Sequence, residues 1–340
     1  MSDRRDTYDR KVQLTGGTTY TVSLPKTWAK ARSLEPGDRI RLHPRGGRLL
    51  LTRPEREADR ETVTVSAARH DPAGVERIVV AAYVAGADVV RVDGAPDRDA
   101  RAAVRDAVGG LVGIEVAEET DAEMVARTML DIDDLPPERT LARMEDRTLT
   151  MHEEAVAAAL AGDGAAGRRV SDQDDGVDRL FRLLAREFQR SLGRVSGGAD
   201  GGLTAFDHYA VARQLERVAD HAEKIATAAV TIEEPAPDPI AADLDRLAAD
   251  ARTVVDRAFS EVLAECDPRT LGGIVADADA LIEGTKRVDR ELYDRGLADG
   301  YVLATVLDSV TRTVEYGINI ADAGLRAALR SDRTATEKRP

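Results

Sequence analysis

The stretch QLERVADHAEKIA, residues 214–226, decides the class of fold for the second half of the chain. Its apolar residues recur every three or four positions, which is the spacing of one face of an α-helix. Glu216 and Asp220 are four residues apart, so they lie one turn apart on the same side of that helix. The helix therefore has one side suited to packing in a bundle, and two carboxylates that either face solvent or hold a cation.

The same periodicity continues through residues 136–330. Three long helical segments precede the proline-rich stretch EEPAPDP, and three follow it. A helix with one apolar face buries it best against other helices. The pattern predicts a repeat of about 95 residues, forming two three-helix bundles over 136–232 and 238–330. Within the first, the stretch AGDGAAGRRVSDQDDG, residues 161–176, is predicted as a loop.

Aligning KIAT (224–227) with NIAD (319–322) shows how the two halves correspond. Asp220 then pairs with Glu315, Glu216 with Thr311, and His221 with Tyr316. A carboxylate thus recurs at the same depth in both halves. The candidate metal-facing carboxylates are Glu216, Asp220, Glu315 and Asp322.

Two interpretations of these carboxylates stay open. Hard cations take several oxygen ligands, and carboxylates at i and i+4 supply two from one helix. Alternatively, the carboxylates pair with the nearby cations Arg217 or Lys224 on a solvated face. If a metal is bound, the first two helices offer further ligands, for instance Glu145 or Asp178.

LERVADH (215–221), VDRLFRLLAREF (177–188) and the tandem repeat resemble the PhoU family of phosphate-uptake regulators. The resemblance covers about residues 136–330. It implies a non-enzymatic regulator that couples phosphate supply to transport or signalling. It also implies divalent or ferric metal ions held by the paired carboxylates of each bundle.

Residues 8–53 have a different pattern, with short β-branched runs around Gly16-Gly17 and Gly46-Gly47. These are hairpin signals, and KTWAKARSL between them is a short helix. Four strands in about 45 residues bury too small a core to be stable alone, so we expect two copies to interleave. The segment RKVQLTGGTTYTVSLPKTWAKARSLEPGDRIRL resembles the SpoVT/AbrB swapped-hairpin domain in its archaeal form, which implies an intertwined homodimer that contacts DNA.

Charge separates this head from the rest of the chain. Residues 1–60 hold 14 Lys/Arg and 8 Asp/Glu, a net of +6; since the whole chain carries −14, the remainder carries −20. A basic head is the asymmetry expected of a segment that meets a polyanion. By this charge and by the AbrB resemblance, the candidate phosphate-contacting residues are Arg10, Lys11, Lys26, Lys30 and Arg32. The alternative is a module that only dimerises and has a solvated basic face.

The acidic body has a second explanation. The chain has 6 lysines against 42 arginines and is rich in alanine. This composition is typical of a protein from a high-salt cytoplasm, so we expect a halophilic source. Acidity of the body then serves solvation, and high salt weakens phosphate contacts by the head.

Residues 61–131 alternate between strand and helix signals in the order β-α-β-α-β-β. ETVTVSA, DVVRVDG, GIEVAEET and AEMVARTML are predicted strands. VGGLVG lacks the Gly-x-Gly-x-x-Gly spacing of a nucleotide-binding loop. We therefore predict a small α/β domain that serves as a spacer or as a small sensor domain.

Other classes of protein are disfavoured by the sequence. The single cysteine, Cys266, rules out an internal disulfide framework. No apolar run has the length of a membrane span, and we expect a cytoplasmic protein. No nucleophile accompanied by a base is found, so no catalytic residue is assigned.

The predicted fold is multidomain: an all-β swapped-hairpin head (8–53), a small α/β domain (61–131) and two all-α bundles (136–232 and 238–330). The function hypothesis is a regulator of phosphate uptake whose dimeric head contacts DNA, acting in transcription. One alternative is a protein-binding adaptor that restrains a phosphate transporter or its ATPase, with the head serving only to dimerise. A weaker alternative is a metal-dependent hydrolase.

Overall fold

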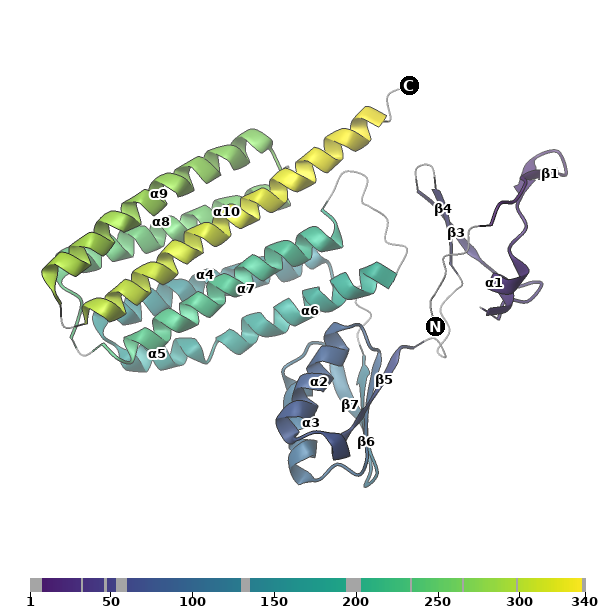
Figure 1. Cartoon of the computed structure of the whole chain (residues 1–340), viewed down its shortest axis with the longest axis horizontal. Helices are drawn as coiled ribbons and strands as arrows, with labels where there is room; N and C mark the ends of the chain where they lie inside the picture. Colours follow the sequence, from purple (N-terminus) through teal and green to yellow (C-terminus); the bar gives the residue numbers. More distant parts are fainter. Residues whose placement is uncertain are drawn as a thin grey trace. The chain divides into compact units, whose positions relative to one another are not determined.

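The structure is a computed structural model that describes residues 8–31, 33–45, 48–52, 60–129, 135–193, 203–232, 234–264, 266–297 and 299–337. The chain divides into two compact units, Met1–Glu57 and Ala58–Pro340. Figure 1 shows the helices and strands of both. The second unit includes the stretches predicted as an α/β domain and as helical bundles.

The N-terminal unit consists of two antiparallel hairpins joined by a short helix, as the sequence predicts. In the first hairpin, Leu14 lies opposite Tyr20, and the turn places Gly16 and Gly17 at φ 65° and 80°. These positive φ values suit glycine, which has no Cβ. The predicted turn at 46–47 lies outside the described residues. The elements are β1 (Gln13–Thr15), β2 (Thr19–Thr21), α1 (Lys26–Ala31), β3 (Arg41–Arg45) and β4 (Arg48–Thr52).

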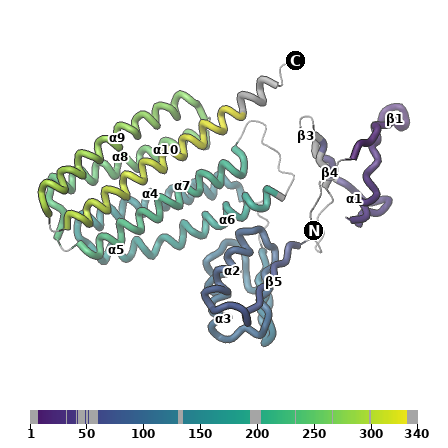
Figure 2. Tube along the Cα trace, viewed as in Figure 1, coloured from purple at the N-terminus to yellow at the C-terminus, as the bar shows by residue number. Residues whose placement is uncertain are grey.

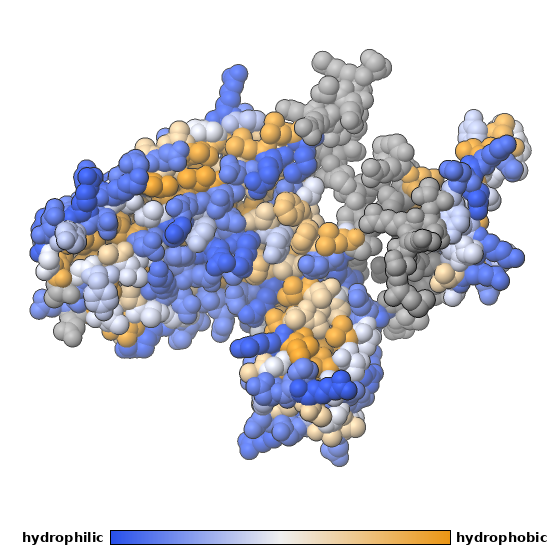
Figure 3. All heavy atoms as spheres, in the orientation of Figure 1, coloured by the Kyte–Doolittle hydropathy of each residue, from blue (hydrophilic) through white to orange (hydrophobic). Residues whose placement is uncertain are grey.

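This unit leaves its apolar side chains in the open. No residue of α1 is buried, and every residue of β1 and β2 is exposed. Apolar side chains stand out on the surface of this unit in Figure 3. Grouped exposed apolar side chains of this kind are typical of a surface that contacts another molecule. This apolar set comprises Val12 (62% exposed), Leu14 (58%), Tyr20 (76%), Leu42 (58%) and Leu49 (54%).

The second unit begins with a four-stranded sheet covered by two helices. The strand order is β5-β6-β8-β7, in which β5 and β6 are parallel and the other pairs are antiparallel. Asp71 and Asp97 each accept a bond from a backbone N–H three residues on, which fixes where the two helices begin. The elements are β5 (Thr62–Ser66), the 3-10 turn η2 (Ala67–Arg69), α2 (Pro72–Val84), β6 (Val89–Asp93), α3 (Arg98–Gly109), β7 (Ile114–Glu119) and β8 (Met124–Thr128).

Long helices make up the rest of the unit, and their apolar faces share one core. Three long helices precede the proline-rich stretch EEPAPDP and three follow it, and we call these two sets the trios. Buried side chains from both trios contribute to the core, among them Leu215, Leu244 and Val310. In Figure 2, α10 lies between α7 and α9. The helices are α4 (Pro137–Ala161), α5 (Gly164–Ser171), α6 (Asp174–Gly193), α7 (Ala205–Ala229), α8 (Asp238–Leu263), α9 (Pro268–Arg295) and α10 (Gly300–Glu337).

One prediction in this region is wrong: much of the expected loop 161–176 is the helix α5. Asp163 caps it by accepting bonds from the N–H groups of Ala165 and Ala166 at 3.0 and 2.9 Å. A Cβ on Gly167 would lie 2.4 Å from the carbonyl oxygen of Ala226. The small residues that suggest a loop thus let α5 pack closely on α7, and packing outweighs propensity.

Among the described residues, no helix has the length and apolarity needed to cross a membrane.

Candidate functional sites

Four of the candidate basic residues of the N-terminal unit, Arg10, Lys11, Lys26 and Lys30, are exposed. Arg10 and Lys11 precede β1, and the Arg10 guanidinium lies 5.6 Å from the centre of the Tyr8 ring. Lys26 and Lys30 are four residues apart on α1, so they lie on one side of the helix. In the part of the unit that the structure describes, neither lysine forms an ion pair. Arg32 lies outside the described residues.

Such an arrangement suits a polyanion. Two unpaired ammonium groups one helical turn apart are free to contact successive phosphates, which requires charge rather than base recognition. The structure thus presents four of the five predicted residues at an accessible surface.

The carboxylates of α7 lie beside arginines. Glu216, whose side chain is 13% exposed, accepts a bond from Arg213 at 2.8 Å. Arg217 lies 4.0 Å from Glu216 and 3.7 Å from Asp220. Burial, together with the Asp220 charge, raises the pKa of Glu216, and burial raises that of Asp220. The first carboxylate pair is therefore held by two cations of its own helix.

A further carboxylate from α6 joins this face. Burial, and next the charges of Asp178, Glu223, Asp220 and Asp175, raise the pKa of Asp174 to about 7. At neutral pH Asp174 is therefore a mixture of charged and neutral forms. The sequence pattern singled out Asp178 on this helix but not Asp174.

The equivalent point in the second trio is less acidic. Arg312 donates to Glu315 at 2.7 Å, and the Thr311 hydroxyl donates to the Leu307 carbonyl. Asp322 is half-buried about two turns further along α10. Glu315 and Asp322 lie on a helix other than that of Glu216 and Asp220, so the four candidates form two pairs.

Contacts between α7 and α10 join the two trios. Lys224 contacts Asp308 at 3.2 Å rather than a carboxylate of its own helix. His221 and Tyr316, which the repeat alignment makes equivalent, meet with 3.2 Å between Nε2 and the hydroxyl. Burial lowers the pKa of His221, with the Lys224 charge as the second cause. His221 thus has a hydrogen-bonded place between the trios.

The described side chains do not fit a metal ion as they stand. Within the described ranges, no group of three or more His, Cys, Asp or Glu side chains is placed to hold one. One carboxylate oxygen of Glu216 and one of Glu315 already accept bonds from arginine, while the other oxygen of Glu216 is buried and has no hydrogen-bond partner among the described residues. Metal binding at the four candidates therefore stays a prediction of the sequence.

A cluster of arginines on α6 escaped the sequence interpretation. Arg186 is fully buried, and its Nη1 donates to the carbonyls of Tyr83 and Ala87, both at 2.7 Å. Its guanidinium also lies 4.7 Å from the centre of the Tyr83 ring. Since the partners are about 100 positions away in sequence, no local pattern reveals this contact.

The neighbouring turns of α6 extend the contact. Arg190 donates to the Gly86 carbonyl at 3.2 Å and ion-pairs with Asp88, while Arg182 donates to the Gly110 carbonyl at 3.3 Å. Arginines at i, i+4 and i+8 thus bind the loops that follow α2 and α3. We call Arg182, Arg186 and Arg190 the arginine clamp. It couples the α/β part to the helical body through charged hydrogen bonds.

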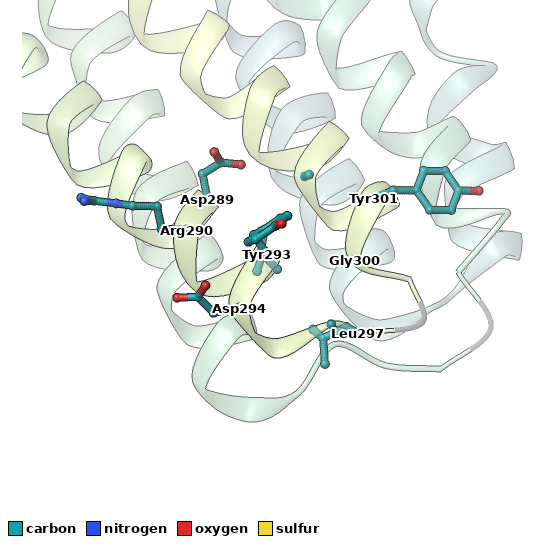
Figure 4. Close-up of a pocket in the computed structure, with 10 residues that line it drawn as sticks. Asp289, Arg290, Tyr293, Asp294, Leu297, Gly300 and Tyr301 are labelled. Carbon is teal, nitrogen blue, oxygen red and sulfur yellow. The ribbon is translucent and has the colours of Figure 1, made fainter.

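Two pockets lie near the turn between α9 and α10. The first, about 510 Å³, lies between Tyr293, Leu297 and Tyr301, with Asp289 and Asp294 at its side (Figure 4). Tyr293 and Tyr301 are 88% and 75% exposed. The second, about 460 Å³, shares Tyr301 and includes Asp220, Lys224, Thr227 and Thr305. Exposed aromatic rings beside a hollow suit contact with another molecule.

Together these features define a protein with a β-hairpin head, an α/β part and a helical body of seven described helices, α4 to α10. Comparison with known proteins agrees. Residues 141–229 match the PhoU domain family, and residues 13–59 match "Antidote-toxin recognition MazE, bacterial antitoxin". The chain therefore carries a PhoU domain and a MazE/AbrB-like N-terminal domain.

A solved structure agrees with the fold of the body. The crystal structure of PhoU from Pseudomonas aeruginosa is similar with a TM-score of 0.52 and 20% identity, over 58% of this chain and 97% of that one. At this identity the likeness shows the fold alone. None of the curated proteins compared with the chain matches it. The predicted multidomain fold class is confirmed.

Proposed function

We propose that the protein is a non-enzymatic regulator of phosphate homeostasis that binds DNA as a dimer through its N-terminal unit. The observation that carries this proposal is the pairing of two features in one chain. Residues 141–229 of the body match the PhoU domain, and the head combines an uncovered apolar set with exposed lysines.

The dimer follows from the apolar set of the head. Leu14 and Tyr20 lie opposite each other on β1 and β2, and both are more than half exposed. Covering them needs a surface of matching shape, and a second copy of the same hairpins offers one, as in an isologous interface. The resemblance to swapped-hairpin domains supports the same arrangement.

DNA contact follows from the position of the lysines. A dimer brings two copies of the Lys26 and Lys30 pair to one assembly, and each ammonium that meets a phosphate releases counterions. The contacts are to phosphate, so they position the head without specifying sequence. In this proposal, Arg10, Lys11 and Arg32 add further charge.

The body supplies the link to phosphate. Its fold supports contact with a phosphate transporter or a signalling protein, and the hollow beside Tyr293 and Tyr301 is a candidate contact surface. The same proposal includes a cytoplasmic location and a halophilic source. It also includes a divalent or ferric ion bound at the candidate carboxylates. Elemental analysis of the purified protein, with Asp220→Asn as control, tests the metal.

The test is the salt dependence of DNA binding by the full chain. The double variant Lys26→Ala/Lys30→Ala removes two cations per chain, or four per dimer. Since each phosphate contact contributes about 0.9 to the slope of log K against log[salt], the slope should fall by about 3 to 4. Lys286→Ala removes an exposed lysine of α9 that pairs with Glu283, and serves as the matched control.

An unchanged slope in the double variant would refute DNA contact by the head. If such a protein remained dimeric, the adaptor alternative would be favoured, with the head acting only in dimerisation. A monomeric chain would refute the dimer itself.

A further inference from the structure

The two edge strands of the four-stranded sheet differ in how they are protected. β7 carries Glu115, Glu118 and Glu119, and its pairing with β8 is irregular between Val116 and Glu118. Charges and bulges are the usual means by which proteins keep an edge strand from pairing with another chain. By these criteria, the β7 edge is blocked.

β5 has none of this protection. Its sequence, Thr-Val-Thr-Val-Ser over residues 62–66, contains no charge, proline or glycine, and its ladder with β6 has no irregularity. Over the described residues, no other strand pairs with it. Threonine and valine, which make up four of its five residues, are among the residue types enriched in strands. The sheet thus has one closed edge and one edge that is ready to pair.

The register shows which backbone groups are available on this edge. The carbonyl of Glu61 accepts from the N–H of Val89 on β6. Since alternate residues of a strand direct both backbone groups to the same side, Val63 and Val65 also face β6. The N–H and C=O groups of Thr62, Thr64 and Ser66 therefore point outward.

We infer that β5 pairs with β5 of a second copy of this chain, antiparallel and centred on Thr64. A two-fold axis through Thr64 places Thr62 opposite the Ser66 position of the other copy. Three residue pairs that each exchange two bonds give six inter-chain hydrogen bonds. The two sheets then join into one of eight strands.

The side chains of β5 suit this self-pairing. On one face, the hydroxyls of Thr62, Thr64 and Ser66 form a row against the same row of the other copy, and cross-strand Thr pairs are favourable. On the face covered by α2, Val63 lies opposite Val65. Val63 is half-buried and Val65 is 4% exposed. Pairing therefore covers the exposed part of Val63 with the Val65 side chain of the second copy.

We choose a second copy of the chain as the partner of the β5 edge, because a dimer of the head keeps the two β5 strands near each other. Nine residues, 53–61, separate the end of β4 from β5, which sets a maximum reach of about 30 Å from the head. In the dimer of the proposed function, on which this step rests, two identical β5 strands are thus tethered at a high effective concentration. A five-residue strand pair that is too weak alone forms under such a tether.

The test is disulfide formation in the full chain. Cys266→Ala removes the native thiol, and Thr64→Cys is then compared with Thr62→Cys. At the two-fold axis the Cα atoms of position 64 should be about 5.5 Å apart, which a disulfide spans. Position 62 faces the same side of the same strand but lies opposite position 66, so it is the matched control. The Thr64→Cys variant should form disulfide-linked dimers at least about tenfold faster.

Light scattering on both variants separates this proposal from the dimer of the head. A chain that is dimeric yet forms no disulfide at position 64 overturns the β5 pairing and leaves the head dimer intact. Equal rates at positions 62 and 64 overturn it as well, since they mean collision rather than a fixed register. A chain that is monomeric by light scattering refutes the head dimer. If its Thr64→Cys variant also forms no disulfide, the β5 pairing is overturned as well.

Slow amide exchange at Thr62, Thr64 and Ser66 in the unmodified chain provides a second measurement. These amides point away from β6, so only pairing protects them. Exchange at the rate of open chain contradicts the pairing without any substitution.

Discussion

Replacing Arg186 with methionine should loosen the α/β part without unfolding the helical body. Arg186 donates to two carbonyls of the α2–β6 region at 2.7 Å. A hydrogen bond from a charged donor contributes about 1.5–3 kcal/mol, so losing both costs about 3–6 kcal/mol. Methionine fills much of the space and restores about 1–2 kcal/mol of apolar packing. The net loss should be about 3 kcal/mol.

The assay is hydrogen exchange read by mass spectrometry on peptides of α2 and β6. A loss of about 3 kcal/mol in the free energy of local opening corresponds to about 100-fold faster exchange. Peptides of α8 and α9, which do not contact the clamp, should exchange as in the unmodified chain. Arg179→Met changes an exposed arginine of the same helix and should leave all rates unchanged.

The reasoning about the clamp would be refuted by exchange in α2 that rises less than about threefold, because the two carbonyls would then be satisfied without Arg186. An equal rise in α8 would also contradict it, since that result means loss of global stability.

Three further outcomes follow from particular side chains. The pKa of Asp174 is about 7 in the folded chain against 3.8 ordinarily, so its contribution to stability is full below pH 4 and lost as the pH rises through 7. Asp174→Asn should therefore raise the free energy of unfolding at pH 8 by about 1–2 kcal/mol, discounted for partial exposure, and a urea titration showing the same gain at pH 4 would contradict this. Gly167→Ala should cost about 1–3 kcal/mol by pushing α5 from α7, measured by thermal unfolding, with Gly272→Ala, which meets open space, as control. Leu14→Asp should convert the dimer to a monomer in light scattering; a dimer that persists means that the hairpin does not form the interface.

Much of the fold follows from local patterns in the sequence. The helices of the body repeat apolar residues at helical spacing, and the strands from Thr62 to Thr128 alternate around turn residues, so both were predictable. The helix α5 was not, because its glycines and alanines favour a loop until α7 packs against them. The capping role of Asp163 is the local signal that identifies this helix.

The candidate sites were only partly predictable. The positions of Glu216 and Asp220 on one helix face follow from their spacing, and so does the alternative of pairing with Arg217. Pairs across the fold do not: Lys224 meets Asp308, 84 residues away, and Arg186 meets Tyr83, 103 residues away. Nothing in the types or spacing of these residues indicates such partners.

The core shared by the two helical trios has a consequence for dissecting the chain. Residues 141–229 are the stretch that matches the PhoU domain family, yet the buried faces of α4 and α7 pack partly on α8 and α10. A fragment limited to those residues would expose the apolar faces of α4 and α7 to water. We expect it to aggregate rather than fold as an independent domain. The smallest soluble fragment of the body should therefore include both halves, α4 to α10, because each buries the apolar face of the other.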